Sequence, residues 1–327
     1  MAFDQLHRRE FITLLSGAAA WPLAARAQQP GRTYRLGVLS QGRRQTPQVV
    51  AFFDELRLSG FIEGHTLAIL PGSFDVPIEQ LAARAAAMVK AAPDALLAVG
   101  EPATRALQAA TQSIPIIGAG EDMVAAGLVA SLSRPGANVT GISLLSPELD
   151  GKRQDILIEA VPNARRMTAL ADATQTRQSH TKALQDAARA RGVELSVIGV
   201  HRLEEIAPAI DAAKTSGAQA VNVLASSLLS VSRRTIFEQM AALRLPAIYQ
   251  WAEMADEGGF AAYGPRLVPL YRQRARMVVK ILRGAKPADI PIEQPTHFEL
   301  VINLKTAQAI GHEVPAGLVL RADKVIE

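Results

Sequence analysis

Two adjacent carboxylates, Glu121 and Asp122, are the residues of this chain best suited to proton-transfer chemistry. They follow an apolar run at 114–118 that predicts a strand, so both are expected at the end of that strand. Paired carboxylates can act as general acid and base, but they also cap helices or bind ligands. Because no nucleophile or further base accompanies the pair, capping and ligand contact are favoured over catalysis.

A second candidate site follows the apolar run 95–99, which predicts a strand buried on both faces, as in a parallel sheet. A glycine then permits a turn, and a proline two residues later suits the start of a helix. Backbone N–H groups at 103 and 104 suit a carboxylate. The turn places four candidate ligand contacts at the carboxyl edge of the sheet: Gly100, Glu101, Pro102 and Ala103.

Polar and aromatic residues also follow other predicted strands, where open α/β sheets bind ligands. A cleft that closes on a small molecule needs flat apolar surfaces and a few oriented hydrogen-bonding groups. Trp251 offers an indole for stacking on a ligand, although core packing is the commoner role of tryptophan. With the residues named above, the predicted ligand-binding set is completed by Ser40, Gln41, Asp172, Ser226, Ser227, Tyr249, Trp251 and Tyr263.

Several kinds of chemistry are not indicated. The chain has no cysteine, so disulfides, thiolate metal sites and cysteine nucleophiles are excluded. Its histidines are dispersed, whereas metal sites need clustered ligands. The phosphate-binding, dinucleotide-binding, nucleophile-elbow and zinc-protease motifs are missing. We therefore expect no metal, no cofactor and no catalytic residue.

The elements that must position these residues alternate between strand and helix, which predicts an α/β fold with parallel sheets covered by helices. A helix is expected after Asp122, ending near Ser133, and another at 266–283. The predicted strands lie at 34–39, 66–70, 95–99, 114–118, 138–143, 167–171, 193–200, 220–225, 245–250, 260–263 and 298–303.

The alternation is interrupted near 143–150 and then restarts, which predicts two similar α/β lobes joined by hinge strands around a cleft. Helix 266–283 is expected to return to the first lobe. The predicted N-terminal lobe spans 32–143 and 265–292, and the C-terminal lobe spans 144–264 and 293–327. One large undivided sheet is the alternative.

The bulk composition fits a two-domain globular protein of 327 residues. The net charge is +4 and there is no block of lysine or arginine, so nucleic-acid binding is not indicated. After the N-terminus, no apolar run reaches the 18 residues that predict a membrane span.

The first residues have the pattern of an export signal. The pair Arg8-Arg9 precedes a weakly apolar run, and Ala25-Arg26-Ala27 fits a small-residue cleavage site. The paired arginines resemble a twin-arginine signal. We predict a signal peptide at 1–27, cleavage after Ala27, and a periplasmic location.

Longer stretches resemble the ABC-transporter substrate-binding protein family that is often linked to tryptophan or tyrosine uptake. The resemblance covers the leader and almost all of the mature chain. It is carried by Gly-Leu-Val-Ala-Ser-Leu-Ser-Arg-Pro-Gly-Ala-Asn-Val-Thr-Gly (127–141), Pro-Ala-Ile-Tyr (246–249) and Gln-Pro-Thr-His-Phe-Glu-Leu-Val-Ile-Asn-Leu-Lys-Thr-Ala (294–307). It implies a type I periplasmic binding fold, a ligand between two Rossmann-like lobes, and delivery to a membrane permease with its ATPase. The loop after strand 167–171 departs from the family, where many relatives carry an Asn-Pro-x-Asn-like turn.

We therefore expect an exported, monomeric solute-binding protein of an ABC importer that closes on an amino acid or on an aromatic or other organic acid. Two alternatives are a periplasmic ligand sensor and, less favoured, a hydrolase or isomerase that uses Glu121 or Asp122. A DNA-binding regulator is disfavoured because an export signal stands where a helix-turn-helix is expected.

Overall fold

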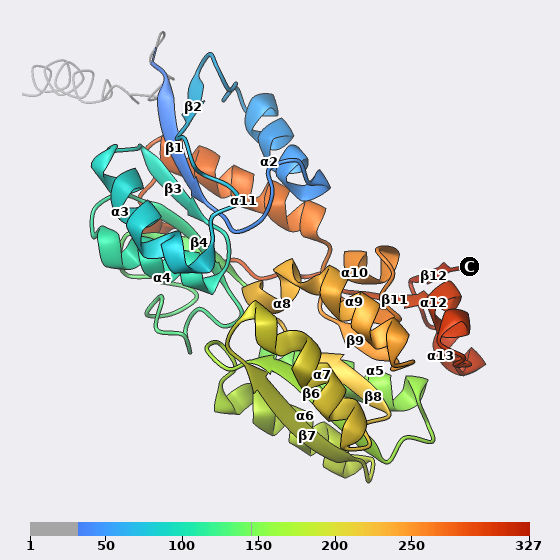
Figure 1. Ribbon diagram of the computed structural model, residues 1–327. Helices are drawn as coiled ribbons and strands as arrows, with labels where there is room; N and C mark the ends of the chain where they lie inside the picture. Colours follow the sequence, from blue (N-terminus) through green and yellow to red (C-terminus); the bar gives the residue numbers. More distant parts are fainter. Residues whose placement is uncertain (1–31, 145) are drawn as a thin grey trace, which may run out of the picture. The chain divides into compact units, whose positions relative to one another are not determined.

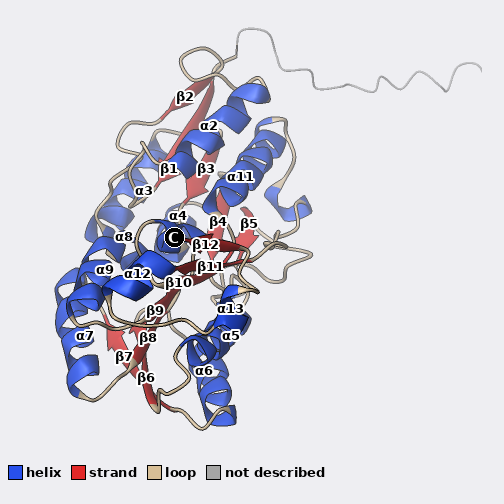
Figure 2. Cartoon of the chain, turned by 90° about the vertical axis from the view of Figure 1, so that its right-hand side faces the viewer, coloured by secondary structure: helices blue, strands red, loops and turns tan. Residues whose placement is uncertain are grey.

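The computed structural model describes residues 32–144 and 146–327, and residues 33–327 form one compact unit. The predicted signal peptide lies outside the described residues. The described chain folds into two sheets with helices on both faces of each, as Figure 2 shows. We call each sheet with its covering helices a lobe.

The first lobe is built on a five-stranded, fully parallel sheet with the order β2-β1-β3-β4-β5 (Figure 2). The predicted strands of this lobe are confirmed, with small shifts at their ends. Its elements are β1 (Tyr34–Leu39), α2 (Pro47–Leu58), β2 (Leu67–Ile69), α3 (Leu81–Lys90), β3 (Ala95–Ala98), α4 (Glu101–Ala110), β4 (Ile116–Gly120) and β5 (Val139–Ser143).

Both faces of this sheet are buried, as the continuous apolar runs predict. Successive side chains of a strand point to opposite faces. Leu36 and Leu97 therefore join the core under α2, whereas Leu39 and Leu96 join the core under α3 and α4. All four side chains are almost fully excluded from solvent.

The second lobe is built on a seven-stranded sheet with the order β12-β11-β10-β9-β8-β6-β7. It is parallel except where β10 pairs with β11. Its elements are α5 (Ser146–Ala160), β6 (Arg166–Asp172), α6 (Gln178–Ala190), β7 (Glu194–Val200), α7 (Ile206–Thr215), β8 (Ala220–Val223), α8 (Ser227–Val231), α9 (Arg233–Ala242), β9 (Ala247–Tyr249), α10 (Ala252–Asp256), β10 (Ala261–Gly264), β11 (Glu299–Asn303), α12 (Leu304–Ala309), α13 (Ala316–Val319) and β12 (Lys324–Ile326).

The two sheets repeat one strand order, because β7-β6-β8-β9-β10 follows the same pattern as β2-β1-β3-β4-β5. In this arrangement the chain leaves the first strand in one direction and later returns to its other side. Ligands bind at that switch point, at the carboxyl ends of the strands. Here the switch points lie between β1 and β3 and between β6 and β8.

The chain passes between the sheets three times: after β5, after β10, and between residues 293 and 299. Helix α11 (Leu267–Leu282) follows the second passage and packs against α2, as Figure 1 shows. Its residues Leu270 and Val278 belong to the core of the first lobe. Residue Glu293 then pairs with β5 before the chain returns to β11.

One predicted element is wrong. The segment after Asp122 forms consecutive turns and no helix. Backbone bonds within the segment close these turns, such as Ala126 N–H to the Asp122 oxygen at 2.9 Å. Two further carbonyl groups accept from α4: Ala126 from Arg105 Nη2 at 2.6 Å and Leu128 from Gln108 Nε2 at 3.0 Å. Gly127 interrupts the segment with a positive φ of 67°. The short strand β12 and helix α10 were not predicted.

Candidate functional site

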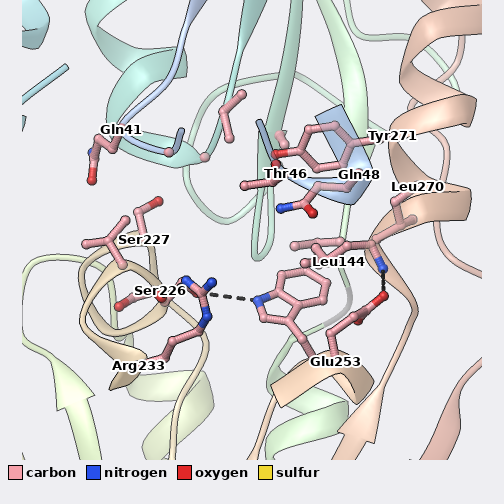
Figure 3. A pocket seen from close by; sticks show the side chains of 18 of the residues that line it. Gln41, Thr46, Gln48, Leu144, Ser226, Ser227, Arg233, Glu253, Leu270 and Tyr271 are labelled. Atoms are coloured by element: carbon pink, nitrogen blue, oxygen red, sulfur yellow. Dashed lines mark hydrogen bonds between the residues drawn. The ribbon is translucent and has the colours of Figure 1, made fainter. Parts of the chain in front are cut away.

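A pocket of about 210 Å³ is lined by residues of both sheets and of α11 (Figure 3). Its volume suits a compact ligand of amino-acid size rather than a large cofactor. From the predicted set it contains six residues: Gln41, Gly100, Glu121, Ser226, Ser227 and Trp251.

The first lobe contributes backbone and small groups from its switch point. Gln41 follows β1 and Gly100 follows β3, and these two strands are neighbours in the sheet. Gly100 has a φ of 89°, a conformation that favours glycine. A β-carbon at this position would overlap Ser227 Oγ of the second lobe, so the two lobes approach each other closely here.

The second lobe contributes the start of α8 and the turn after β9. Ser226 caps α8, since its hydroxyl accepts a hydrogen bond from the Leu229 N–H at 3.0 Å. Ser230 Oγ accepts a bond from Trp251 Nε1 at 3.3 Å, which orients the indole. Trp251 is half-buried and packs against core residues of both lobes. Trp251 therefore both lines the pocket and joins the two lobes.

Helix α11 supplies pocket residues that the sequence analysis missed. Leu267, Leu270, Tyr271 and Arg274 all line the pocket and recur at intervals of three, one and three residues, along one face of the helix. The sequence did contain a signal, since Arg274 lies on an otherwise apolar face of the helix. Charged residues normally lie on the opposite, solvated face, so an arginine here indicates a special role.

Burial shifts the ionisation of three groups that line the pocket. Desolvation raises the pKa of the Glu253 carboxyl, and hydrogen bonds and nearby Arg266 oppose the shift only in part. Desolvation also raises the pKa of the Tyr271 phenol, and Arg274 opposes that shift. The pKa of the Arg274 guanidinium is lowered by desolvation, against the influence of Tyr271.

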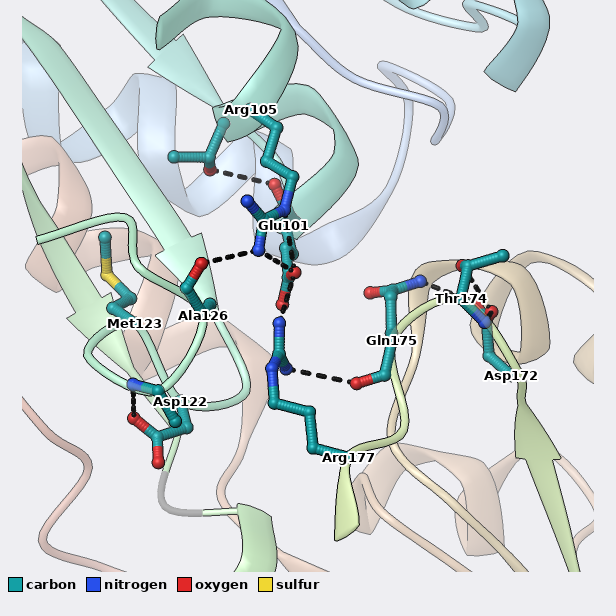
Figure 4. A network of polar contacts seen from close by, with 12 residues as sticks. Glu101, Arg105, Asp122, Met123, Ala126, Asp172, Thr174, Gln175 and Arg177 are labelled. Carbon is teal, nitrogen blue, oxygen red and sulfur yellow. Dashed lines mark hydrogen bonds and ion pairs between the residues drawn. The ribbon is translucent and has the colours of Figure 1, made fainter. Parts of the chain in front are cut away.

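The predicted residue Glu101 belongs to a polar network that joins the lobes beside the pocket (Figure 4). Its Oε1 accepts bonds from Arg105 on the same helix at 2.9 Å and from Arg177 of the second lobe at 2.6 Å. Arg177 also donates to the Gln175 carbonyl at 3.0 Å, and Gln175 Nε2 donates to Asp172 at 2.5 Å. Asp172 thus holds the loop that carries Arg177.

The other predicted residues do not line the pocket. Asp122 caps its own turn, because Oδ1 accepts from the N–H groups of residues 124 and 125. The Thr104 N–H donates to the Gly100 carbonyl at 3.1 Å, so it is not free for a carboxylate. The rest lie in or near the cores or beside the pocket: Pro102 and Ala103 within α4, Tyr249 against Phe237, Tyr263 stacked on Phe298, and Ser40 beside a neighbouring depression.

Among residues 32–144 and 146–327, no group of three or more His, Asp or Glu side chains is placed to hold a metal ion. Over the same residues, no helix combines the length and the apolar character needed to cross a membrane.

Comparison with known proteins decides the family. A family profile described as ABC transporter substrate binding protein matches residues 60–326. The chain belongs to this family. A tyrosine-binding protein from Clostridioides difficile (strain R20291) is 27% identical to this substrate-binding protein over 265 residues, which cover 79% of this chain and 75% of that one.

Solved structures agree on the fold. A conserved domain protein from Vibrio cholerae O1 biovar El Tor has a TM-score of 0.80 at 23% identity, covering 90% of this chain and 100% of that one. An ABC domain from Streptococcus pneumoniae, in complex with L-Trp, has a TM-score of 0.78 at 24% identity with the same coverage. This substrate-binding protein has the type I periplasmic binding fold, as the sequence predicted.

Proposed function

We propose that this substrate-binding protein is the exported, monomeric component of an ABC importer. In this proposal the chain closes around a small organic molecule, an amino acid or an aromatic or other organic acid, and releases it unchanged. It then delivers the ligand to a membrane permease with its ATPase. Residues 1–27 act as a cleaved signal peptide, and the mature chain works in the periplasm.

One observation supports this proposal above the others: a compact pocket receives residues from the carboxyl ends of both sheets. A ligand held there touches both lobes, so its binding energy favours the closed arrangement over the open one. Hinge motion at the interlobe passages is the expected response. We assign residues 32–143 and 265–292 to one moving body and residues 144–264 and 293–327 to the other.

The kind of ligand is suggested by the pocket walls and by the relatives. Apolar side chains such as Ile142, Leu144 and Leu270 line the pocket together with Trp251 and Tyr271. Relatives named above include a tyrosine-binding protein and a structure holding L-Trp. An aromatic or branched apolar body fits these walls.

The proposal is tested by thermal-shift screening of the purified mature chain against amino acids, aromatic acids, other organic acids and neutral analogues. Isothermal calorimetry then measures the affinity of each hit, and chromatography of the recovered ligand shows whether it is intact. Absence of any hit, or chemical turnover of the ligand, would contradict the proposed function.

Trp251 provides the site-directed test. Because its indole lines the pocket and touches both lobes, Trp251→Ala is expected to weaken binding of the best hit by about 1–3 kcal/mol. Trp251→Phe keeps a flat ring and is the matched control, expected to lose less. Unchanged calorimetric affinity in Trp251→Ala would remove this residue from the site.

A further inference from the structure

Among the residues that the structure describes, the buried cation Arg274 has no anionic partner. It lies on α11, lines the pocket, and is only 4% exposed. Its Nη2 donates to the carbonyl oxygen of Ala98 at the end of β3, and its Cζ lies 5.2 Å from the centre of the Tyr271 ring. Its buried Nε has no hydrogen-bond partner within the described part of the chain. The neighbours of the guanidinium are therefore a carbonyl dipole and a neutral phenol.

This arrangement differs from that of the other buried arginine in the described chain. Arg153 is 1% exposed and forms an ion pair with buried Asp150. Among residues 32–144 and 146–327, Arg274 forms no ion pair with a carboxylate. Arg233, which also lines the pocket, is more exposed and pairs with Glu257.

A guanidinium keeps its proton at every physiological pH, so burial cannot neutralise it. Buried charges in proteins are normally paired, because removing a charge from water is costly. We therefore expect the negative charge that pairs with Arg274 to belong to the ligand in the pocket. Arginine binds carboxylates through two parallel hydrogen bonds, which makes it selective for that group.

The other residues that line the pocket restrict the rest of the ligand molecule. Gln41 Nε2 is a second buried donor at the pocket that finds no partner among residues 32–144 and 146–327. The side chains of Ile142, Leu144 and Leu270, by contrast, are apolar. The pocket holds about 210 Å³, which leaves room for one compact apolar body beside the anionic group. A polyanion or a sugar matches these walls poorly.

We propose that Arg274 receives the carboxylate of the ligand, so that the pocket selects small carboxylic acids with an apolar body. This inference rests on the proposed function, since it names the class of solute that the same pocket binds. The ligand carboxylate would give Arg274 the anionic partner that it lacks among the described residues. Arg274 is thereby the residue that determines specificity for acids over neutral analogues.

The test uses the mature chain with four acids and their amides: L-tryptophan, L-tyrosine, 3-phenylpropanoate and 4-methylpentanoate. At least one acid is expected to bind about 10- to 100-fold more tightly than its amide, the range for a hydrogen-bonded charge. Arg274→Met should remove that preference, because it weakens binding of the acid but not of the amide. Arg274→Lys should keep part of the preference.

The melting temperature of the empty protein provides a second readout. Removing an unpaired buried charge should leave the melting temperature of Arg274→Met unchanged or raise it. If Arg274 only joins α11 to β3, the opposite is expected. The melting temperature of Arg274→Met would then fall, and binding of acid and amide would weaken equally. Arg276→Met is the matched control, because Arg276 lies on the exposed face of the same helix and pairs with Glu55 at 3.2 Å.

The two proposals fail in different ways. Equal binding of acid and amide, retained acid preference in Arg274→Met, or binding of neutral compounds alone would overturn the inference while the binding function stands. Absence of binding by every compound in the wider screen would overturn the proposed function itself.

Discussion

Glu253 is the second pocket residue that carries an incompletely satisfied charge. Its Oε1 accepts a hydrogen bond from the Leu267 N–H at 2.8 Å, which joins α10 to the start of α11. Its Oε2 is buried and has no hydrogen-bond partner in the described structure. Because burial favours the neutral acid, this group is a cost to the folded state whenever it is ionised.

Glu253→Gln should therefore stabilise the protein in a pH-dependent way. With a pKa raised by folding, wild-type Glu253 binds its proton more tightly in the folded state. The folded state thus loses stability, relative to the variant, as pH rises from the ordinary carboxyl range towards neutrality. Glutamine keeps the acceptor for Leu267. Urea unfolding measures the difference in free energy of unfolding between the two proteins at several pH values between about 4 and 8. This range begins near the ordinary carboxyl pKa. A constant difference across that range would contradict the assignment.

The same site shows what residue-level sequence reasoning can and cannot reach. Gln41, Gly100 and Ser226 were predicted as ligand contacts because each follows a strand, and strand ends share one edge of a parallel sheet. Tyr249 was predicted on the same ground, yet its ring packs against Phe237 in the core. Position at a strand end fixes where a residue lies along the sheet, but not which way its side chain points.

At the scale of elements, apolar runs bounded by glycine or proline predicted the parallel strands well, because a strand buried on both faces leaves a continuous signal. The segment after Asp122 was misread because its alanines favour a helix. It forms consecutive turns closed by its own backbone bonds, and side chains of α4 bind two of its carbonyl groups. The contribution of α11 to the pocket was missed: Arg274 on its apolar face was a signal, but where that face lies depends on how the helix packs against the first lobe.

Gly141 lies on β5, close to the backbone of the neighbouring strand β4 and near the first interlobe passage. It pairs with Gly118 of β4 and has a φ of 151°. A β-carbon on Gly141 would overlap the Gly118 backbone, which cannot rotate away as a side chain can. The β4–β5 pair thus tolerates no side chain here.

Gly141→Ala is expected to destabilise the protein by more than about 3 kcal/mol, because backbone strain and a backbone clash add. Gly127→Ala is the matched control. It also replaces a glycine of positive φ, but nothing lies near its added carbon, so about 1–2 kcal/mol is expected. Denaturant unfolding compares them, and equal losses would show that the Gly118 contact is unimportant.

At the scale of the whole molecule, the Glu101–Arg177 ion pair connects the lobes outside the pocket. Glu101 is 3% exposed and keeps Arg105 as a partner within its own helix. Arg177 comes from the loop after β6, where the sequence departs from the family pattern. Opening of the lobes would separate Arg177 from Glu101 but leave Arg105 in place.

Arg177→Met should therefore weaken ligand binding without unfolding either lobe. Loss of one partly buried charged hydrogen bond predicts about 1–2 kcal/mol, or roughly 5- to 30-fold in affinity, mainly through faster ligand release. Stopped-flow release and calorimetry measure the effect. Arg166→Met removes an exposed pair with Glu194 within the second sheet and is the control. Identical release rates in wild type and Arg177→Met would show that this pair does not hold the lobes together.

The placement of Trp251 has a practical outcome. The sequence contains two tryptophans, Trp21 and Trp251, and Trp21 falls within the proposed leader. The mature chain would then carry one indole, which packs against the hydrophobic cores of both lobes and lines the pocket. Its fluorescence is a natural optical reporter, so a titration can be followed in unlabelled protein, at concentrations far below those that calorimetry needs.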